Sequence, residues 1–184
     1  MTISNKHFLV VIFFITNSIF SQYSKEFLKV VSNIKPYDSI KVIEKFKNGK
    51  LKKEYIKTFY IVGKSKYWRY SGKFSEYYKN GNTATNQTFD KFGFLLNYEF
   101  FNKKGILISE IKTKVIDTDN KNVLDFFNNK MKHNIISDYK EYYYDKKYNF
   151  LYREGQKHNN DKIGIWRTYN NCGDTIKIKE FRKR

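Results

Sequence analysis

The stretch Gly164-Ile-Trp166-Arg-Thr-Tyr169-Asn-Asn-Cys-Gly173 decides the fold, because its spacing recurs position for position in Gly72-Lys-Phe74-Ser-Glu-Tyr77-Tyr-Lys-Asn-Gly81. A third copy, Tyr98-Glu-Phe-Phe101-Asn-Lys-Lys-Gly105, carries the last two-thirds of the pattern, with Gly93 five residues upstream of Tyr98. A degenerate fourth copy is Phe46-Lys-Asn-Gly49. The first aromatic residues stand at 74, 98 and 166, so one gap is 24 residues and the next is 68, close to three such steps. Self-similarity at a fixed period indicates a repeat architecture.

Each copy is interpreted as a β-hairpin. Asn48-Gly49 and Asn80-Gly81 predict two-residue turns, because both residue types tolerate positive φ. Lys104-Gly105 and Cys172-Gly173 fit a longer loop with a glycine bulge better. The two aromatic residues of a copy are three apart, which sends them to opposite faces of a regular strand. We interpret them as structural residues that pack on neighbouring copies.

The spacing G-x-W-x-x-Y-x-x-x-G resembles the bacterial variant of the MORN repeat, over residues 39–115 and 148–181. The resemblance implies a non-catalytic binding or scaffold module. Some bacterial proteins of this kind are named YwqK family antitoxins, which implies neutralisation of a toxin in the cytoplasm. The amino-terminal segment of this chain departs from that implication.

Residues 1–21 predict a secretory signal peptide. Lys6 and His7 form a basic start, Phe8–Ile15 is an unbroken apolar run, and Ser21 is a small residue at its end. The run is shorter than the roughly 20 residues that a membrane-spanning helix needs. The alternatives are a core helix or a retained membrane anchor. The remaining chain divides into a helical segment, 22–38, and a MORN-like β-repeat domain, 39–184, with a helical insertion around 120–134.

Two short helices are expected. Ser24–Ile34 has helical apolar spacing with Ser24 as its cap, and Pro36 stops it. We expect this helix to pack on the first strands of the sheet. In the insertion, Val123, Leu124, Phe127 and Met131 share one helical face. That helix is expected to cover an open face or edge of the sheet, and its alternative role is to bind a partner. The predicted fold is therefore mainly β: an antiparallel meander of repeated β-hairpins with an N-terminal helix and one inserted helix.

The charge is strongly positive, with 36 Lys and Arg against 18 Asp and Glu, a formal net charge of +18. Such a surface attracts acidic polymers, acidic proteins and anionic lipid headgroups. Export makes nucleic acid the least favoured acidic polymer, so the expected partners are an envelope protein or an acidic envelope polymer, with peripheral membrane contact. The alternative is that lysine is simply the solubilising residue of a biased composition, in which Ala84 is the only alanine.

The sequence indicates no enzyme, no catalytic residue, no cofactor and no metal site. His133 and His158 lack the spaced Cys or carboxylate partners of a zinc site. Asp117–Asn122 departs from a calcium loop and fits a turn and helix cap. Glu54 and Glu110 occupy equivalent repeat positions, which favours strand-surface residues over a catalytic pair.

The remaining functional signal combines aromatic and basic residues. Exposed rings anchor protein interfaces or stack on sugars, and neighbouring cations attract acidic groups. The predicted function is a non-catalytic, exported binding or scaffold module of the bacterial cell envelope, periplasmic or at the cell surface. The alternatives are an immunity or antitoxin-like protein that neutralises a toxin, and an enzyme acting on envelope glycans. The predicted binding surface comprises Tyr67, Trp68, Arg69, Tyr78, Lys79, Tyr142, Tyr143 and Tyr144.

Overall fold

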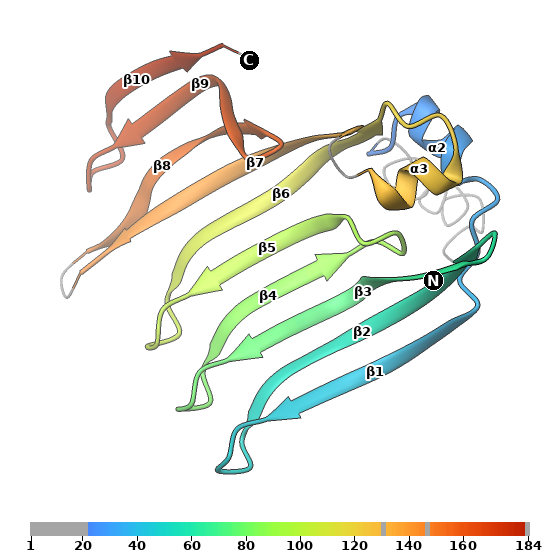
Figure 1. Cartoon of the computed structure of the whole chain (residues 1–184). Helices are drawn as coiled ribbons and strands as arrows, with labels where there is room; N and C mark the ends of the chain where they lie inside the picture. Colours follow the sequence, from blue (N-terminus) through green and yellow to red (C-terminus); the bar gives the residue numbers. More distant parts are fainter. Residues whose placement is uncertain (1–21, 130–131, 146–147, 183–184) are drawn as a thin grey trace, which may run out of the picture.

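The computed structural model describes residues 22–129, 132–145 and 148–182, so the predicted signal segment lies outside the described residues. Ten strands form one antiparallel sheet in which every strand pairs with the next along the chain (Figure 1). The mainly β meander is confirmed, and β1 and β10 are its two edges. The strands are β1 (Asp38–Lys45), β2 (Leu51–Val62), β3 (Ser65–Tyr77), β4 (Thr83–Phe89), β5 (Leu95–Phe101), β6 (Leu107–Thr118), β7 (His133–Tyr144), β8 (Asn149–His158), β9 (Asp161–Tyr169) and β10 (Thr175–Phe181).

Five of the hairpin turns share one geometry. The first residue of each turn donates its N–H to the carbonyl four residues on, and the glycine three residues on donates back to the first carbonyl. These glycines have positive φ, as in a type I turn closed by a glycine bulge. The first residues of the turns are Phe46, Tyr78, Asp90, Asn102 and Asn170. The glycine bulges predicted for Lys104-Gly105 and Cys172-Gly173 are confirmed.

The two-residue turns predicted at Asn48-Gly49 and Asn80-Gly81 are wrong. Among the described non-glycine residues, positive φ occurs at Asn159 and Asn160, which form the two-residue turn between β8 and β9. Asn48 and Asn80 instead use their side chains, which accept from the backbone N–H two residues on, at 3.2 and 3.1 Å. This Asx-type bond stabilises the longer turn and removes the need for a left-handed asparagine.

The two motif aromatics point to opposite faces, as the spacing predicts. Phe74 stacks on Tyr55 with ring centroids 5.4 Å apart, whereas the Tyr77 hydroxyl donates to Glu54, the neighbour of Tyr55 on β2, at 2.9 Å. The carboxyl-terminal copy repeats this arrangement. Trp166 lies against Gly155, and the Tyr169 hydroxyl donates to Glu154 at 2.6 Å.

The strand register places both first aromatics on one face of the sheet. Directly opposed residues of an antiparallel pair share a face. Starting from Phe74 on β3, each residue opposes one on the next strand, in the order Gln87, Tyr98, Ile111, Tyr139 and Gly155. Gly155 is the residue against which Trp166 packs. Phe74 is 6% exposed and Trp166 is 3% exposed, so both rings serve as core between adjacent strands.

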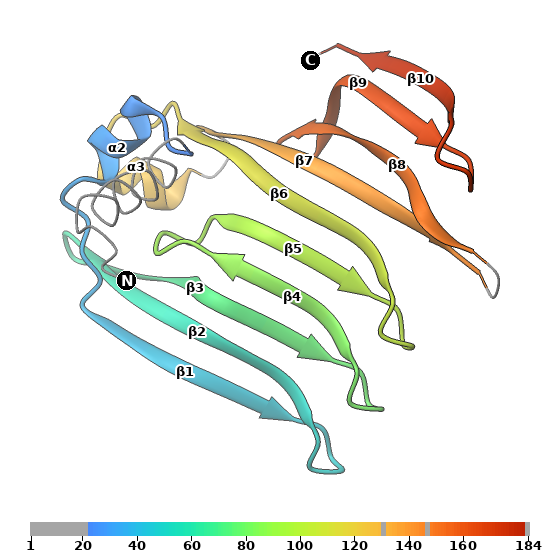
Figure 2. The ribbon, with the colours of Figure 1, turned by 180° about the vertical axis from the view of Figure 1, so that it is seen from behind.

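Helices α2 (Lys25–Val31) and α3 (Val123–Asn128) lie together at one end of the central strands, which the view from behind also shows (Figure 2). Ser24 caps α2 by accepting from the Phe27 N–H, and Asn122 caps α3 by accepting from the Asp125 N–H, both at 2.9 Å. Both caps agree with the sequence prediction. Within the described ranges, no helix has the length and apolar character to cross a membrane.

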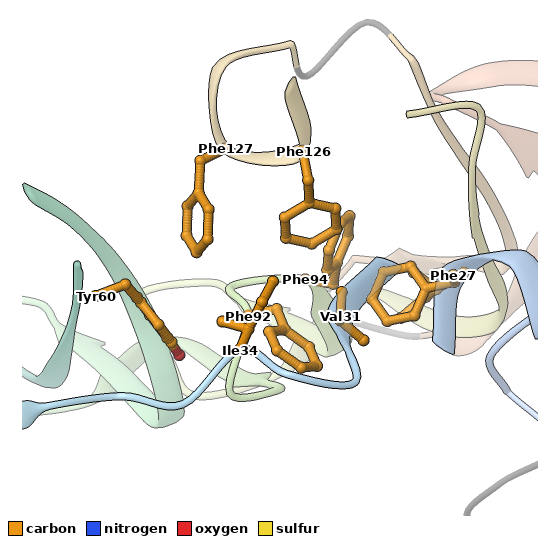
Figure 3. Packing of buried hydrophobic residues seen from close by; sticks show 9 residues of the cluster. Phe27, Val31, Ile34, Tyr60, Phe92, Phe94, Phe126 and Phe127 are labelled. Atoms are coloured by element: carbon orange, nitrogen blue, oxygen red, sulfur yellow. The ribbon is translucent and has the colours of Figure 1, made fainter. Parts of the chain in front are cut away.

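The main apolar cluster lies under these helices (Figure 3). Its members are Phe27, Val31, Ile34, Tyr60, Phe92, Phe94, Ile116, Phe126 and Phe127. The Ser24 N–H donates to the Ile116 carbonyl at 3.0 Å, so the start of α2 is bonded to β6 in the middle of the sheet. The sequence predicts packing of this helix on the first strands instead. In α3 the buried pair is Phe126 and Phe127, while Leu124 is 47% exposed, so the predicted apolar face is wrong at Leu124. Met131, the last residue of that predicted face, lies outside the described residues.

Candidate functional site

The predicted aromatic and basic surface is divided among separate places. Tyr67 and Arg69 pack beneath α3: the Tyr67 ring stacks on Phe127 at 4.8 Å, and the Arg69 guanidinium donates to the Phe127 carbonyl at 2.8 Å. Burial lowers the pKa of Arg69. Trp68 points the other way, is 44% exposed, and has the Lys57 ammonium 4.7 Å from its ring centroid.

The remaining predicted surface residues lie near the opposite ends of the strands. Tyr78 donates to the Phe101 carbonyl at 2.6 Å and Lys79 follows it in the turn between β3 and β4. Tyr142 donates to Glu110 at 2.9 Å, and burial together with this carboxylate raises the pKa of Tyr142 to about 12. Tyr143 donates to Asp145, and Tyr144 lies 5.6 Å from the Lys104 ammonium. These residues therefore do not form one binding surface.

A different group of residues is brought together on β7 to β10. Four cations surround the rings of Tyr139, Trp166 and Phe181, and we name them the cationic face: Arg153, Lys157, Lys162 and Lys179. The Lys157 ammonium is 4.0 Å from the Tyr139 ring centroid, and the Lys162 ammonium is 4.3 Å from that of Trp166. Cation–π attraction at these distances holds the long side chains in place.

The strand register explains why these side chains share a face. Lys179 opposes Trp166 across β9 and β10, and Arg153 opposes Glu141 across β7 and β8. Residues two apart on a strand lie on the same face of the sheet. The residues of the cationic face therefore occupy alternate positions along each strand. Beneath the cationic face, Gly155 leaves room for the indole, because a Cβ there would lie 2.4 to 2.5 Å from three indole atoms.

The electrostatics of the cationic face are unbalanced. Arg153 forms an ion pair with Glu141. Among the described residues, Glu141 is the acidic side chain that contacts the cationic face. Glu154 and Glu180 belong to the other face, since they oppose Arg167 and Ile165. Four cations thus meet one carboxylate.

This imbalance acts on the titration of the lysines. Burial lowers the pKa of Lys157 and Lys162, and the positive charge of Arg153 lowers both further. Like charges held together disfavour the charged form. An anion bound here would relieve that repulsion, which gives the cationic face a physical reason to accept an acidic ligand.

A cleft of about 630 Å³ beside the helices is a weaker candidate. Its lining includes Arg69 and Asp161, one residue of each charge. His133, also in the lining, is engaged at both nitrogens, with Thr118 Oγ1 at 3.1 Å and the Phe126 carbonyl at 3.2 Å. Over the described ranges, no group of three or more His, Cys, Asp and Glu side chains could hold a metal ion.

The sequence carried part of the signal for the cationic face. Trp166 and the alternating Lys177-Ile-Lys179 mark strands, but Tyr139, Arg153 and Lys179 become neighbours only through the pairing of four strands. Comparisons with protein-family models, with curated proteins and with solved structures find no match for this chain.

Proposed function

We propose that the protein is a non-catalytic, exported binding module of the bacterial cell envelope that holds acidic groups on the cationic face. The single observation that carries the proposal is the gathering of Arg153, Lys157, Lys162 and Lys179 around three rings with Glu141 as their acidic contact. Export rests on the basic and apolar pattern of residues 1–21. The ligand class is an acidic envelope polymer or an acidic envelope protein.

The Trp166 ring supports the cations and does not present its face to a ligand. Trp166 is 3% exposed, so a sugar cannot stack on it in this arrangement. Binding through the cationic face is therefore electrostatic, and charge pairing at an accessible surface is screened by salt. We expect affinity to fall as ionic strength rises.

The test is co-sedimentation of the purified protein with envelope fractions at low and high salt. The variant carries Lys157→Gln, Lys162→Gln and Lys179→Gln. A matched control carries Lys47→Gln, Lys103→Gln and Lys121→Gln, three exposed lysines outside the cationic face, so that both proteins lose the same charge. We expect the first variant to bind about tenfold more weakly than the control, because mutating contacting charges removes specific electrostatic complementarity.

Equal loss in both variants would mean that net charge alone drives the association and would reject the cationic face as a site. An unmodified protein that fails to co-sediment even at low salt would reject the binding function. Crosslinking in cells distinguishes ligand classes: a single captured toxic protein would favour the immunity-like alternative, and diverse envelope components would support a scaffold.

A further inference from the structure

We infer that copies of this chain associate head to tail, with β10 of one copy pairing antiparallel with β1 of the next, so that the meander continues across molecules. This inference does not depend on the proposed ligand. It rests on the two edges of the described sheet, the register shared by two of the repeats, and the residues that this register would oppose.

No strand of the described residues pairs with the outer side of β1 or of β10. In the row of strands β1 and β10 stand at opposite ends, and the helices lie over the ends of central strands (Figure 1). A free edge presents unpaired N–H and C=O groups, which are a template for another strand. The edges also carry exposed apolar side chains, with Ile43 54% exposed on β1 and Ile178 64% exposed on β10.

The repeats predict the register of such a pair. In two of the repeats, the fourth residue after the turn glycine opposes the residue that lies two positions before the next turn. Lys53, fourth after Gly49, opposes Glu76, second before Tyr78. Thr85, fourth after Gly81, opposes Phe100, second before Asn102. The strand after Gly105 differs, because Ser109 opposes Glu141, which lies four positions before the turn at Asp145.

The same rule applied to the two edges opposes Lys177, fourth after Gly173, to Glu44, second before Phe46. That pair would reproduce the ion pair between Lys53 and Glu76, which are 2.5 Å apart within the chain. Continuing the register places Ile178 opposite Ile43 and Glu180 opposite Lys41. This register would pair opposite charges on both faces and bury the two exposed isoleucines against each other. It is the register of the β4–β5 pair, and of the β2–β3 pair next to its turn.

One alternative, a symmetric pairing of two β10 strands centred on Ile178, is disfavoured. An antiparallel pair centred on Ile178 would place Lys177 of each copy opposite Lys179 of the other. Like charges directly opposed across strands are destabilising. A pairing of unlike edges does not close on itself within a dimer, so it produces rings or growing chains.

Crosslinking tests the register directly. One copy carries Ile43→Cys and another carries Ile178→Cys, both with Cys172→Ser to remove the native thiol. Opposed residues of an antiparallel pair have Cα atoms about 4.5–5.5 Å apart, within the range that a disulfide bridges. The control pairs Ile43→Cys with Ile176→Cys, which the register displaces by two residues. We expect the mixed 43–178 disulfide to form fastest. Faster crosslinking of Ile178→Cys alone, or an equal rate with Ile176→Cys, would overturn the proposal.

Charge reversal gives a second readout that misfolding cannot imitate. Glu44→Lys and Lys177→Glu should each weaken self-association about tenfold in sedimentation velocity, since like charges replace an opposed ion pair. A mixture of the two variants should associate as the unmodified protein does, because each end then meets an opposite charge. An unmodified protein that sediments as a monomer at every concentration, or a mixture that is not rescued, would overturn the inference.

Discussion

Gly155 provides the sharpest test of the packing between repeats. Its Cβ would lie 2.4 to 2.5 Å from three indole atoms of Trp166, whereas carbon atoms pack at about 3.5–4.0 Å, so Gly155→Ala must move the buried ring by about 1 Å. Overpacking of this kind costs about 1–3 kcal/mol. The shift also weakens the 3.1 Å bond from the Trp166 indole N–H to the Gln156 carbonyl, a further loss of about 1 kcal/mol. The expected destabilisation is about 2–4 kcal/mol.

Thermal unfolding followed by circular dichroism measures this loss, which corresponds to a Tm about 5–15 °C lower for a domain of this size. Gly164→Ala is the matched control, because no atom lies within 4 Å of its Cβ and its φ is +62°. Its cost is purely conformational, about 1–2 kcal/mol. The double change Gly155→Tyr with Trp166→Phe recreates the Tyr55 and Phe74 pair and should recover most of the stability that Gly155→Tyr alone loses. A Gly155→Ala protein within about 0.5 kcal/mol of the original would refute the tight packing of the indole on Gly155. A double variant no more stable than Gly155→Tyr alone would refute the equivalence of the two sites.

Three further outcomes are expected. Burial raises the pKa of Asp90 although backbone N–H groups and Tyr23 hydrogen-bond to the carboxylate, so the folded chain holds this proton more tightly than the unfolded chain. The stabilising contribution of Asp90 is therefore complete below the unfolded value of about 3.9 and declines as pH rises through the folded pKa. Asp90→Asn should flatten that decline in urea midpoints measured between about pH 4 and 7, and an unchanged pH profile would contradict the assignment. Tyr77→Phe and Tyr169→Phe should each lower the free energy of unfolding by about 1 kcal/mol in urea titrations, because each hydroxyl donates to a glutamate on the neighbouring strand; a loss at only one site would show that the copies differ. Ser24→Ala should cost about 1 kcal/mol by removing the cap of α2, and Ser32→Ala at the other end of that helix should cost much less.

The sequence is informative wherever a local rule decides the structure. The spacing of Gly72, Phe74 and Tyr77 predicts a hairpin strand with aromatics on both faces, and Ser24 predicts the start of α2. These features depend on residues a few positions apart, so they can be read without knowing which strands meet. The meander follows because each strand pairs with its sequence neighbour.

The residues of the predicted binding surface lie apart for a reason that is also local. Tyr67, Trp68 and Arg69 are consecutive, and consecutive strand residues alternate between faces. Two of them pack under Phe127 and the third is exposed on the other side. Cations and rings that share one face of a sheet occupy alternate positions on each strand and opposed positions on paired strands. Finding such a group in a sequence requires the strand register, and the register is known only once the glycine bulges are placed.

The two proposals meet in the geometry of the sheet. Pairing β10 with β1 in the repeat register keeps each face continuous, so every added copy would present its cationic face on the same side as the last. A long acidic polymer could then engage several copies at once, and each contact after the first would be intramolecular, with an effective concentration set by the spacing of copies. A single copy offers four cations against one carboxylate, which is a modest attraction once salt screens it. In the original protein, affinity should rise with the length of the acidic polymer. In Glu44→Lys this dependence should be lost, while short acidic oligomers should bind both proteins equally. That combination of results would show that self-association and ligand binding by the cationic face are separate properties.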